Sequence, residues 1–127
     1  MKKIATALFL SCAALLINVS AQKRTAKNPC DDAQTQYDMN ICADKQFQAV
    51  DAELNRVYKQ LMSKAENDPK LKAAEVSWLK YRDDNCAYEA SMYEGGSMQP
   101  MVYSFCLERM TKTRTAELRG QLKEFDK

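Results

Sequence analysis

The sequence predicts an all-α protein, a three-helix antiparallel bundle or hairpin stapled by two disulfides. Apolar residues recur at spacings of three and four over most of the chain beyond residue 35, which is the period of one face of an α-helix. Two helix-breaking sequences, Asn67-Asp68-Pro69 and Gly95-Gly96, divide this pattern into three segments. Four cysteines follow an N-terminal leader, and an even number of cysteines in a short exported chain indicates two disulfides.

Residues 1–21 have the features of a cleaved signal peptide. Two lysines give a positive start, an apolar run extends from Ile4 to Val19, and residues 19–21 form a small-residue cleavage signature. A membrane-spanning helix needs about 20 apolar residues, and this run is shorter. A lipid anchor at Cys12 is the alternative, but cleavage there would split the apolar run. We therefore expect a periplasmic or secreted protein with no stable membrane anchor after cleavage.

The sequence beyond residue 21 predicts a short arm followed by one domain without net charge. Residues 22–29 are polar, basic and without periodicity, so we expect a flexible N-terminal arm there and a helical domain over residues 30–127. The formal net charge of +2 is carried by Lys2 and Lys3, which leave with the signal peptide. Nucleic-acid binding depends on neutralising phosphates, so a domain without net charge is not expected to bind nucleic acid.

The composition argues against an enzyme. The chain has no histidine, which excludes a Ser-His-Asp or Cys-His triad and any histidine-ligated metal site. It also has no glycine-rich phosphate loop. Carboxylate pairs could perform glycosidase chemistry, but spacing along the sequence does not show whether two of them face each other. We expect no catalytic residues, no metal and no cofactor, and an enzyme is kept only as a third alternative.

The first helix is expected over residues 36–64. Thr35 is a suitable N-cap, and Asp38 stands where a capping box places an acidic or amide side chain. Helical spacing puts six apolar residues on one face: Ala43, Phe47, Val50, Leu54, Val57 and Leu61.

The second helix is expected over residues 69–93. Asp68 can cap it, and a proline at the first helical position loses no intrahelical hydrogen bond. Glycines 95 and 96 end it, because glycine accepts the left-handed conformation that closes a helix. Its predicted inward face consists of Leu71, Ala74, Trp78, Tyr81, Asn85, Tyr88 and Met92.

The third helix is expected to begin within residues 97–100 and to end near residue 125. Gly120 is an internal weak point that costs about 1 kcal/mol relative to alanine. The apolar side of this helix consists of Tyr103, Leu107, Met110, Leu118, Leu122 and Phe125.

Counting residues outward from the two turns places several polar side chains at one level, because short connections make consecutive helices antiparallel neighbours. We expect a carboxylate to hold Arg82, with Asp51 as the leading partner. We interpret this polar layer as a structural network that fixes helix register, and a binding or catalytic centre is the alternative. The layer consists of Asp51, Asn55, Arg82, Thr111 and Arg114.

The same count brings all four cysteines to one end of the bundle. Four cysteines allow three pairings. Cys86 and Cys106 are nearly equidistant from the Gly-Gly turn, so a bond between them is geometrically natural, and Cys30 would then pair with Cys42. The two pairings that cross between helices stay open, because their ends also meet there.

Several motifs together resemble a known family. The first half of the chain contains Cys30, Met39-Asn40-x-Cys42-Ala43 and Asp51-x-Glu53-Leu54-Asn55-x-x-Tyr58. The second half contains Trp78-Leu79-x-Tyr81-Arg82-Asp83-x-x-Cys86, Gly96-Ser97-Met98-x-Pro100 and Cys106-x-x-x-Met110-Thr111-x-x-Arg114-x-x-x-Leu118. In combination, and over nearly the whole chain beyond the leader, they resemble the lysozyme inhibitor LprI-like family.

That family consists of small exported bacterial helical domains and takes its name from a mycobacterial lipoprotein that inhibits lysozyme. The resemblance therefore implies a periplasmic or secreted helical protein that inhibits lysozyme. This chain lacks a convincing lipobox, which argues against membrane anchoring.

Opposite charges gather at the two ends of the expected bundle. Acidic residues lie at the start of the first helix and late in the second: Asp31, Asp32, Asp38, Asp44, Asp83, Asp84, Glu89 and Glu94. Basic residues lie at the other end: Lys64, Lys70, Lys72, Arg119, Lys123 and Lys127. An acidic end would steer a basic lysozyme toward it. The helix dipole alone also favours the acids at the start of the first helix.

We expect a partner to dock at the acidic end, around the turn between the second and third helices. Methionines adapt to irregular surfaces, and tyrosines are frequent interface anchors. The expected partner-binding residues are Asp83, Asp84, Tyr93, Glu94, Gly95, Gly96, Ser97, Met98 and Tyr103. The leading function is lysozyme inhibition by occlusion. The alternative is a structural or envelope-stress interaction module that binds another envelope protein.

Overall fold

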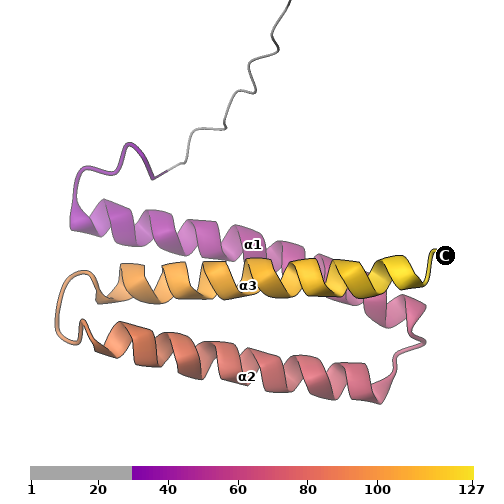
Figure 1. Ribbon diagram of the computed structural model, residues 1–127. Helices are drawn as coiled ribbons and strands as arrows, with labels where there is room; N and C mark the ends of the chain where they lie inside the picture. The colour runs from indigo at the N-terminus through magenta and orange to yellow at the C-terminus, as the bar shows by residue number, and fades with distance from the viewer. Residues whose placement is uncertain (1–29) are drawn as a thin grey trace, which may run out of the picture.

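A computed structural model describes residues 30–127, which form three α-helices and contain no β-strand. The helices are α1 (Gln36–Lys64), α2 (Pro69–Ser91) and α3 (Gln99–Glu124), and consecutive helices run in opposite directions (Figure 1). The all-α prediction is confirmed. None of these helices is both long enough and apolar enough to cross a membrane. The predictions of a signal peptide over residues 1–21 and an arm over residues 22–29 lie outside the described residues.

Local sequence signals set the boundaries of α1 and the start of α2. The Thr35 hydroxyl accepts a hydrogen bond from the Asp38 amide at 3.1 Å and donates one to the Asp38 carboxylate at 2.7 Å. This reciprocal cap begins α1 at Gln36, as predicted. Residues 66 and 67 adopt positive φ angles of 51° and 61°, which reverses the chain. Asp68 then accepts a hydrogen bond from the Lys70 amide at 2.7 Å and begins α2 at the predicted residue.

The turn between α2 and α3 is longer than predicted. α2 ends at Ser91, two residues before the expected end, and residues 92–98 form turns. Gly95 has a φ of +74°, the left-handed conformation that its lack of a Cβ permits. The Gly96 amide donates to the Tyr93 carbonyl at 2.9 Å. α3 begins at Gln99, within the predicted range.

Two apolar clusters fill the bundle, and α3 contributes to both. The first joins α1 and α3 through Leu54, Val57, Leu61 and Leu118, with Tyr58, Leu71, Trp78 and Leu122 packed against them. The second surrounds a disulfide and consists of Cys86, Cys106 and Leu107, with Phe47, Tyr103 and Met110 packed against them. α3 packs more extensively on α1 than on α2. The predicted apolar face of α1 is therefore confirmed as a core face.

The predicted inward face of α2 is wrong by a rotation of about one residue. Tyr81, Tyr88 and Met92 were expected in the core, but they are 60%, 71% and 70% exposed. Ala74 is exposed as well, whereas Leu71 and Trp78 are half-buried as expected. The residues of α2 that are buried are Glu75, Arg82, Cys86 and Ala90. Apolarity gave the wrong face, because α2 buries charged and small side chains instead.

In α3 the predicted apolar side is correct except at its end. Phe125 is half exposed, because α3 ends one residue before it. Leu107 and Leu118 are buried, and Tyr103, Met110 and Leu122 are half-buried.

Two disulfides join Cys30 to Cys42 and Cys86 to Cys106, with a Cα–Cα distance of 5.4 Å in each. This confirms the pairing between neighbouring segments and excludes the crossed pairings. Both bonds lie at the end of the bundle where α1 begins, because Cys42 is early in α1, Cys86 is late in α2 and Cys106 is early in α3. Cys86 and Cys106 are buried in the core, whereas Cys30 and Cys42 are half-buried near the surface.

Candidate partner-binding site

The side chain of Arg82 is the centre of the polar layer and is only 9% exposed. Its Nη1 donates to Asp51 Oδ1 at 2.9 Å and to Thr111 Oγ1 at 3.2 Å, so it joins all three helices. Its Nε donates to Asp83 Oδ1 at 2.9 Å. Asn55 belongs to the same group, because its amide nitrogen donates to the backbone oxygen and the carboxylate of Asp51. Arg82 Nε and Nη1 and the Asn55 amide nitrogen therefore all donate to protein oxygen atoms.

Two guanidinium groups lie near the ring of Trp78. The Cζ atom of Arg82 is 5.4 Å from the Trp78 ring centroid, and that of Arg114 is 5.7 Å from it. Arg82 also lies 5.3 Å from the ring of Phe47. These distances allow cation–π attraction, which is strongest for groups shielded from water. The packing of Trp78 therefore depends on the polar layer as well as on the apolar clusters.

Arg114 binds two carboxylates. Its Nε and Nη2 contact Glu75 Oε2 at 3.0 Å and 2.9 Å, and its Nη1 contacts Glu117 Oε2 at 3.0 Å. Burial lowers the pKa of Arg114, but hydrogen bonds and charge from Glu117 and Glu75 outweigh it and raise the pKa above its ordinary value. Glu75 was missed as a member of this layer. Its spacing of three and seven residues before Trp78 and Arg82 could have identified it, since those positions share a helix face.

One atom of this network is unsatisfied. Glu75 Oε1 is buried and has no hydrogen-bond partner among the described residues. Leaving a buried acceptor unpaired costs free energy, so Arg114 has to compensate through the other oxygen. With its charges paired inside the bundle, the polar layer has the properties of a structural network rather than of an open binding site.

The turn at the acidic end is exposed. We call the acidic end the part of the bundle where α1 begins, α2 ends and α3 begins. All residues from Tyr93 to Met98 are exposed, and the Asn40 side chain of α1 donates to the Ser97 carbonyl at 3.0 Å. Tyr103 lies one turn into α3 and is half-buried against the second apolar cluster.

The structure brings together six of the nine expected partner-binding residues, Tyr93 to Met98, in this turn. Asp83 and Asp84 lie about ten residues earlier in α2, which is about 15 Å along a helix. Asp83 is bound to Arg82, and Asp84 is bound to Lys80 at 2.7 Å. These two carboxylates are therefore separated from the turn and partly neutralised.

Ion pairs also modify the expected charge separation. Glu89 binds Arg109 at 2.8 Å, and the hydrogen bonds from Arg109 and Asn85 lower the pKa of Glu89 below its ordinary value. At the opposite end, Lys64 binds Asp126 at 3.1 Å, so that end has mixed charge. Asp38, Asp44 and Glu94 form no ion pair with any described residue, and they remain the clearest sources of negative potential at the acidic end.

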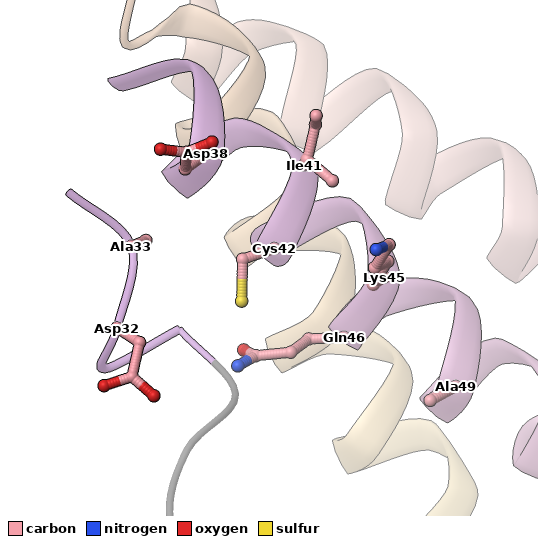
Figure 2. Close-up of a pocket in the computed structure, with 8 residues that line it drawn as sticks. All are labelled: Asp32, Ala33, Asp38, Ile41, Cys42, Lys45, Gln46 and Ala49. Carbon is pink, nitrogen blue, oxygen red and sulfur yellow. The ribbon is translucent and has the colours of Figure 1, made fainter. Parts of the chain in front are cut away.

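Sequence reasoning missed a cleft beside the start of α1. It has a volume of about 500 Å³ and lies between residues 32–33 and the outer face of α1 (Figure 2). Its walls include Asp32, Asp38, Ile41, Lys45, Gln46 and Ala49. We call it the α1 cleft. The pairing of Cys30 with Cys42 was the signal that could have revealed it, since this bond folds the preceding loop back along α1.

Two comparisons with known proteins give matches over most of the chain. A family model described as "Lysozyme inhibitor LprI" matches residues 26–118. The chain is also 35% identical to an uncharacterized protein of Rhizobium meliloti (strain 1021), over 91% of this chain and 90% of that protein. No solved structure matches it significantly.

Proposed function

Because this chain belongs to the lysozyme inhibitor LprI family, we propose that it is an exported binding domain that inhibits lysozyme by occlusion rather than by chemistry. The family match extends over the three helices and all four paired cysteines, apart from the end of α3. The family is one of inhibitors, which supports a protein that binds an enzyme instead of being one.

Export is supported by the two disulfides. Such bonds form and persist in oxidising compartments outside the cytoplasm. Residues 1–21 would be the signal peptide that directs the chain there, and the mature protein would act in the periplasm or after secretion.

The observation that carries the proposed mode of binding is the exposed acidic end. Glu94 lies in the turn, and Asp38 and Asp44 lie in the first turns of α1, all without a cation in ion-pair contact among the described residues. Complementary charge accelerates the association of two proteins and orients them. A basic c-type lysozyme is the partner that this end would attract. Exposed Tyr93 and Met98 would supply the apolar contacts.

The direct test uses the exported form of the protein with both disulfides formed. We expect it to bind an immobilised basic c-type lysozyme and to slow the lysis of a peptidoglycan suspension in proportion to the complex formed. Binding without inhibition would reject occlusion. If the protein neither binds nor inhibits, lysozyme is not the partner, and the alternative of a module for another envelope protein takes its place.

A pair of charge reversals tests the docking end. Glu94→Lys changes the acidic end, and Glu66→Lys makes the same change of net charge in the exposed turn at the opposite end. We expect Glu94→Lys to lower the association rate and to flatten its dependence on ionic strength, while Glu66→Lys stays close to the parent. Equal effects of the two variants would place the docking surface elsewhere.

A further inference from the structure

We propose that Met92 and Met98 are oxidation sites, and that their conversion to methionine sulfoxide by hydrogen peroxide weakens the binding of the partner protein. The effect on binding rests on the proposed function, because both side chains border the exposed turn that would meet a lysozyme. The preferential oxidation of these two residues does not depend on the identity of the partner and is measured separately.

Methionine is concentrated around the turn at the acidic end. Four of the seven methionines of the chain lie between residues 92 and 110. Met92 directly follows α2, and Met98 directly precedes α3, so these two residues flank the turn (Figure 1). Methionine is flexible and apolar and fits irregular surfaces, which suits both side chains to contact with a partner.

Met92 and Met98 differ from the other methionines of the described chain in their exposure to solvent. Met92 is 70% exposed and Met98 is 41% exposed. An oxidant has to reach the sulfur atom, so exposure decides which methionine reacts first. The remaining methionines of residues 30–127 are half-buried: Met39, Met62, Met101 and Met110.

The surroundings of the sulfur atoms show the same difference. Met101 Sδ accepts a hydrogen bond from Gln36 Nε2 at 3.6 Å, and Met110 Sδ lies 3.4 Å from Asn85 Nδ2, beside the buried disulfide. These donors occupy sulfur lone pairs, and the lone pair is the group that attacks an oxidant. For the two exposed methionines, no hydrogen bond to sulfur is formed by any residue in the described part of the chain.

The reaction needs only hydrogen peroxide as co-reactant. A sulfur lone pair attacks one peroxide oxygen, the O–O bond breaks, and proton transfer to the departing oxygen gives a sulfoxide and water. Sulfur is oxidised and peroxide is reduced by the same electron pair, and the protein gains one oxygen atom and no charge. Because hydrogen peroxide is neutral, the negative potential of the acidic end does not repel it.

Oxidation at these residues should change the surface of the turn and preserve the fold. The Tyr93 amide donates to the Ala90 carbonyl at 3.0 Å, and the Val102 amide donates to the Met98 carbonyl at 3.0 Å. The backbone on both sides of the turn is therefore held by bonds that do not involve a thioether. A sulfoxide oxygen is a polar group that loses water when a partner covers it, so the apolar contact is replaced by an unfavourable one.

Peptide mapping by mass spectrometry tests the oxidation sites in the exported protein with both disulfides formed. After incubation with hydrogen peroxide, fragment ions assign each added oxygen atom to one residue. We expect oxidation about tenfold faster at Met92 and Met98 than at the half-buried Met62 and Met110. Equal rates at the exposed and half-buried methionines would overturn the assignment of the sites.

The effect on binding is tested by measuring the Kd for a basic c-type lysozyme before and after peroxide treatment, with the peroxide removed before lysozyme is added. We expect the Kd of the parent to rise about tenfold on oxidation, with the circular dichroism of three helices retained. A parent that is oxidised at both residues and binds as tightly as before would overturn the effect. A parent that does not bind before treatment would reject the proposed function and this effect together, while the oxidation rates still decide the sites.

Two leucine variants show whether these residues cause the change. Met92→Leu/Met98→Leu keeps apolar side chains of similar size but cannot form a sulfoxide. Whatever its starting Kd, this variant should change less than about twofold on peroxide treatment. Met62→Leu, at the opposite end of α1, is the matched control and should respond as the parent does. An equal response of the double variant and the parent would contradict the proposal.

Discussion

α1 and α2 face the same core with different kinds of residue. α1 buries Ala43, Leu54, Val57 and Leu61, whereas α2 buries Glu75, Arg82, Cys86 and Ala90. α1 is therefore held against α3 mainly by burial of apolar surface, whereas α2 combines the packing of Leu71 and Trp78 with ion pairs, ring contacts and a disulfide. The comparison teaches that an inward helix face can be maintained by specific polar and covalent contacts. Such a face lacks the regular spacing of apolar residues from which the buried face of an amphipathic helix is usually predicted.

The largest expected effect is on the first apolar cluster, which joins α1 and α3. Leu118 is fully buried in the first cluster, so Leu118→Ala removes buried surface and leaves a cavity. We expect a loss of about 3–5 kcal/mol in the free energy of unfolding, measured by urea denaturation. A loss below about 1 kcal/mol would mean that the cluster relaxes to fill the cavity. It would also mean that α1 depends less on buried apolar surface than its comparison with α2 indicates.

The next effect concerns the covalent attachment of α2. Cys86→Ala/Cys106→Ala removes a buried disulfide that closes the turn between α2 and α3. We expect destabilisation by about 3 kcal/mol, as the chain-entropy estimate for a loop of this length gives. Native-state hydrogen exchange should accelerate more in α2 than in α1. Uniform acceleration of both helices would show that α2 does not depend on this bond more than α1 does.

A smaller effect is expected at Arg82. Breaking a buried ion pair costs about 3–5 kcal/mol, but Asp51 and Asp83 are 32% and 51% exposed and regain water when Arg82 is removed. We therefore expect Arg82→Ala to cost about 2–3 kcal/mol, and Arg82→Lys to cost less because a cation is kept. Thermal melting compares the two variants, and lysozyme binding should change little once both are folded. A variant that melts like the parent but no longer binds would show that the polar layer is a binding site.

The smallest effect is expected on the face of α2 that apolarity alone had placed in the core. Tyr88 is 71% exposed, so Tyr88→Ser should change the free energy of unfolding by no more than about 0.5 kcal/mol. Tyr58→Ser is the matched comparison, because Tyr58 packs against the first cluster. Equal destabilisation by the two changes, measured by thermal melting, would show that Tyr88 is covered in solution.

The difference between α1 and α2 also explains what the sequence could predict. Helix boundaries depend on local residues, and Thr35, Asp68 and Gly95 take the cap and turn conformations that their chemistry favours. Counting along antiparallel helices favoured the observed disulfide pairing but left the two crossed pairings open, and the structure excludes them. The inward face of α2 could not be read in this way, because Glu75 and Arg82 are buried only by virtue of partners on other helices.

In the candidate site, too, features set by local sequence were predictable, and features set by packing between segments were not. The position of the turn at residues 93–98 was predictable from Gly95 and Gly96, but its length was not, because α2 ends at Ser91, two residues before the predicted end. The neutralisation of Asp83 by Arg82 depends on the rotation of α2, which apolarity misjudged. The α1 cleft arises from the path of the loop between Cys30 and Thr35, which no periodicity describes.

Placing both disulfides at one end gives the bundle an uneven stiffness. At the opposite end, the described residues are held by side-chain packing and ion pairs such as Lys64–Asp126, with no covalent link between helices there. Local unfolding on heating should therefore begin near the turn at residues 65–68 and spread toward the end that carries the disulfides. The end proposed to meet the partner would be the last to lose its shape, so transient opening elsewhere would leave the complex in place.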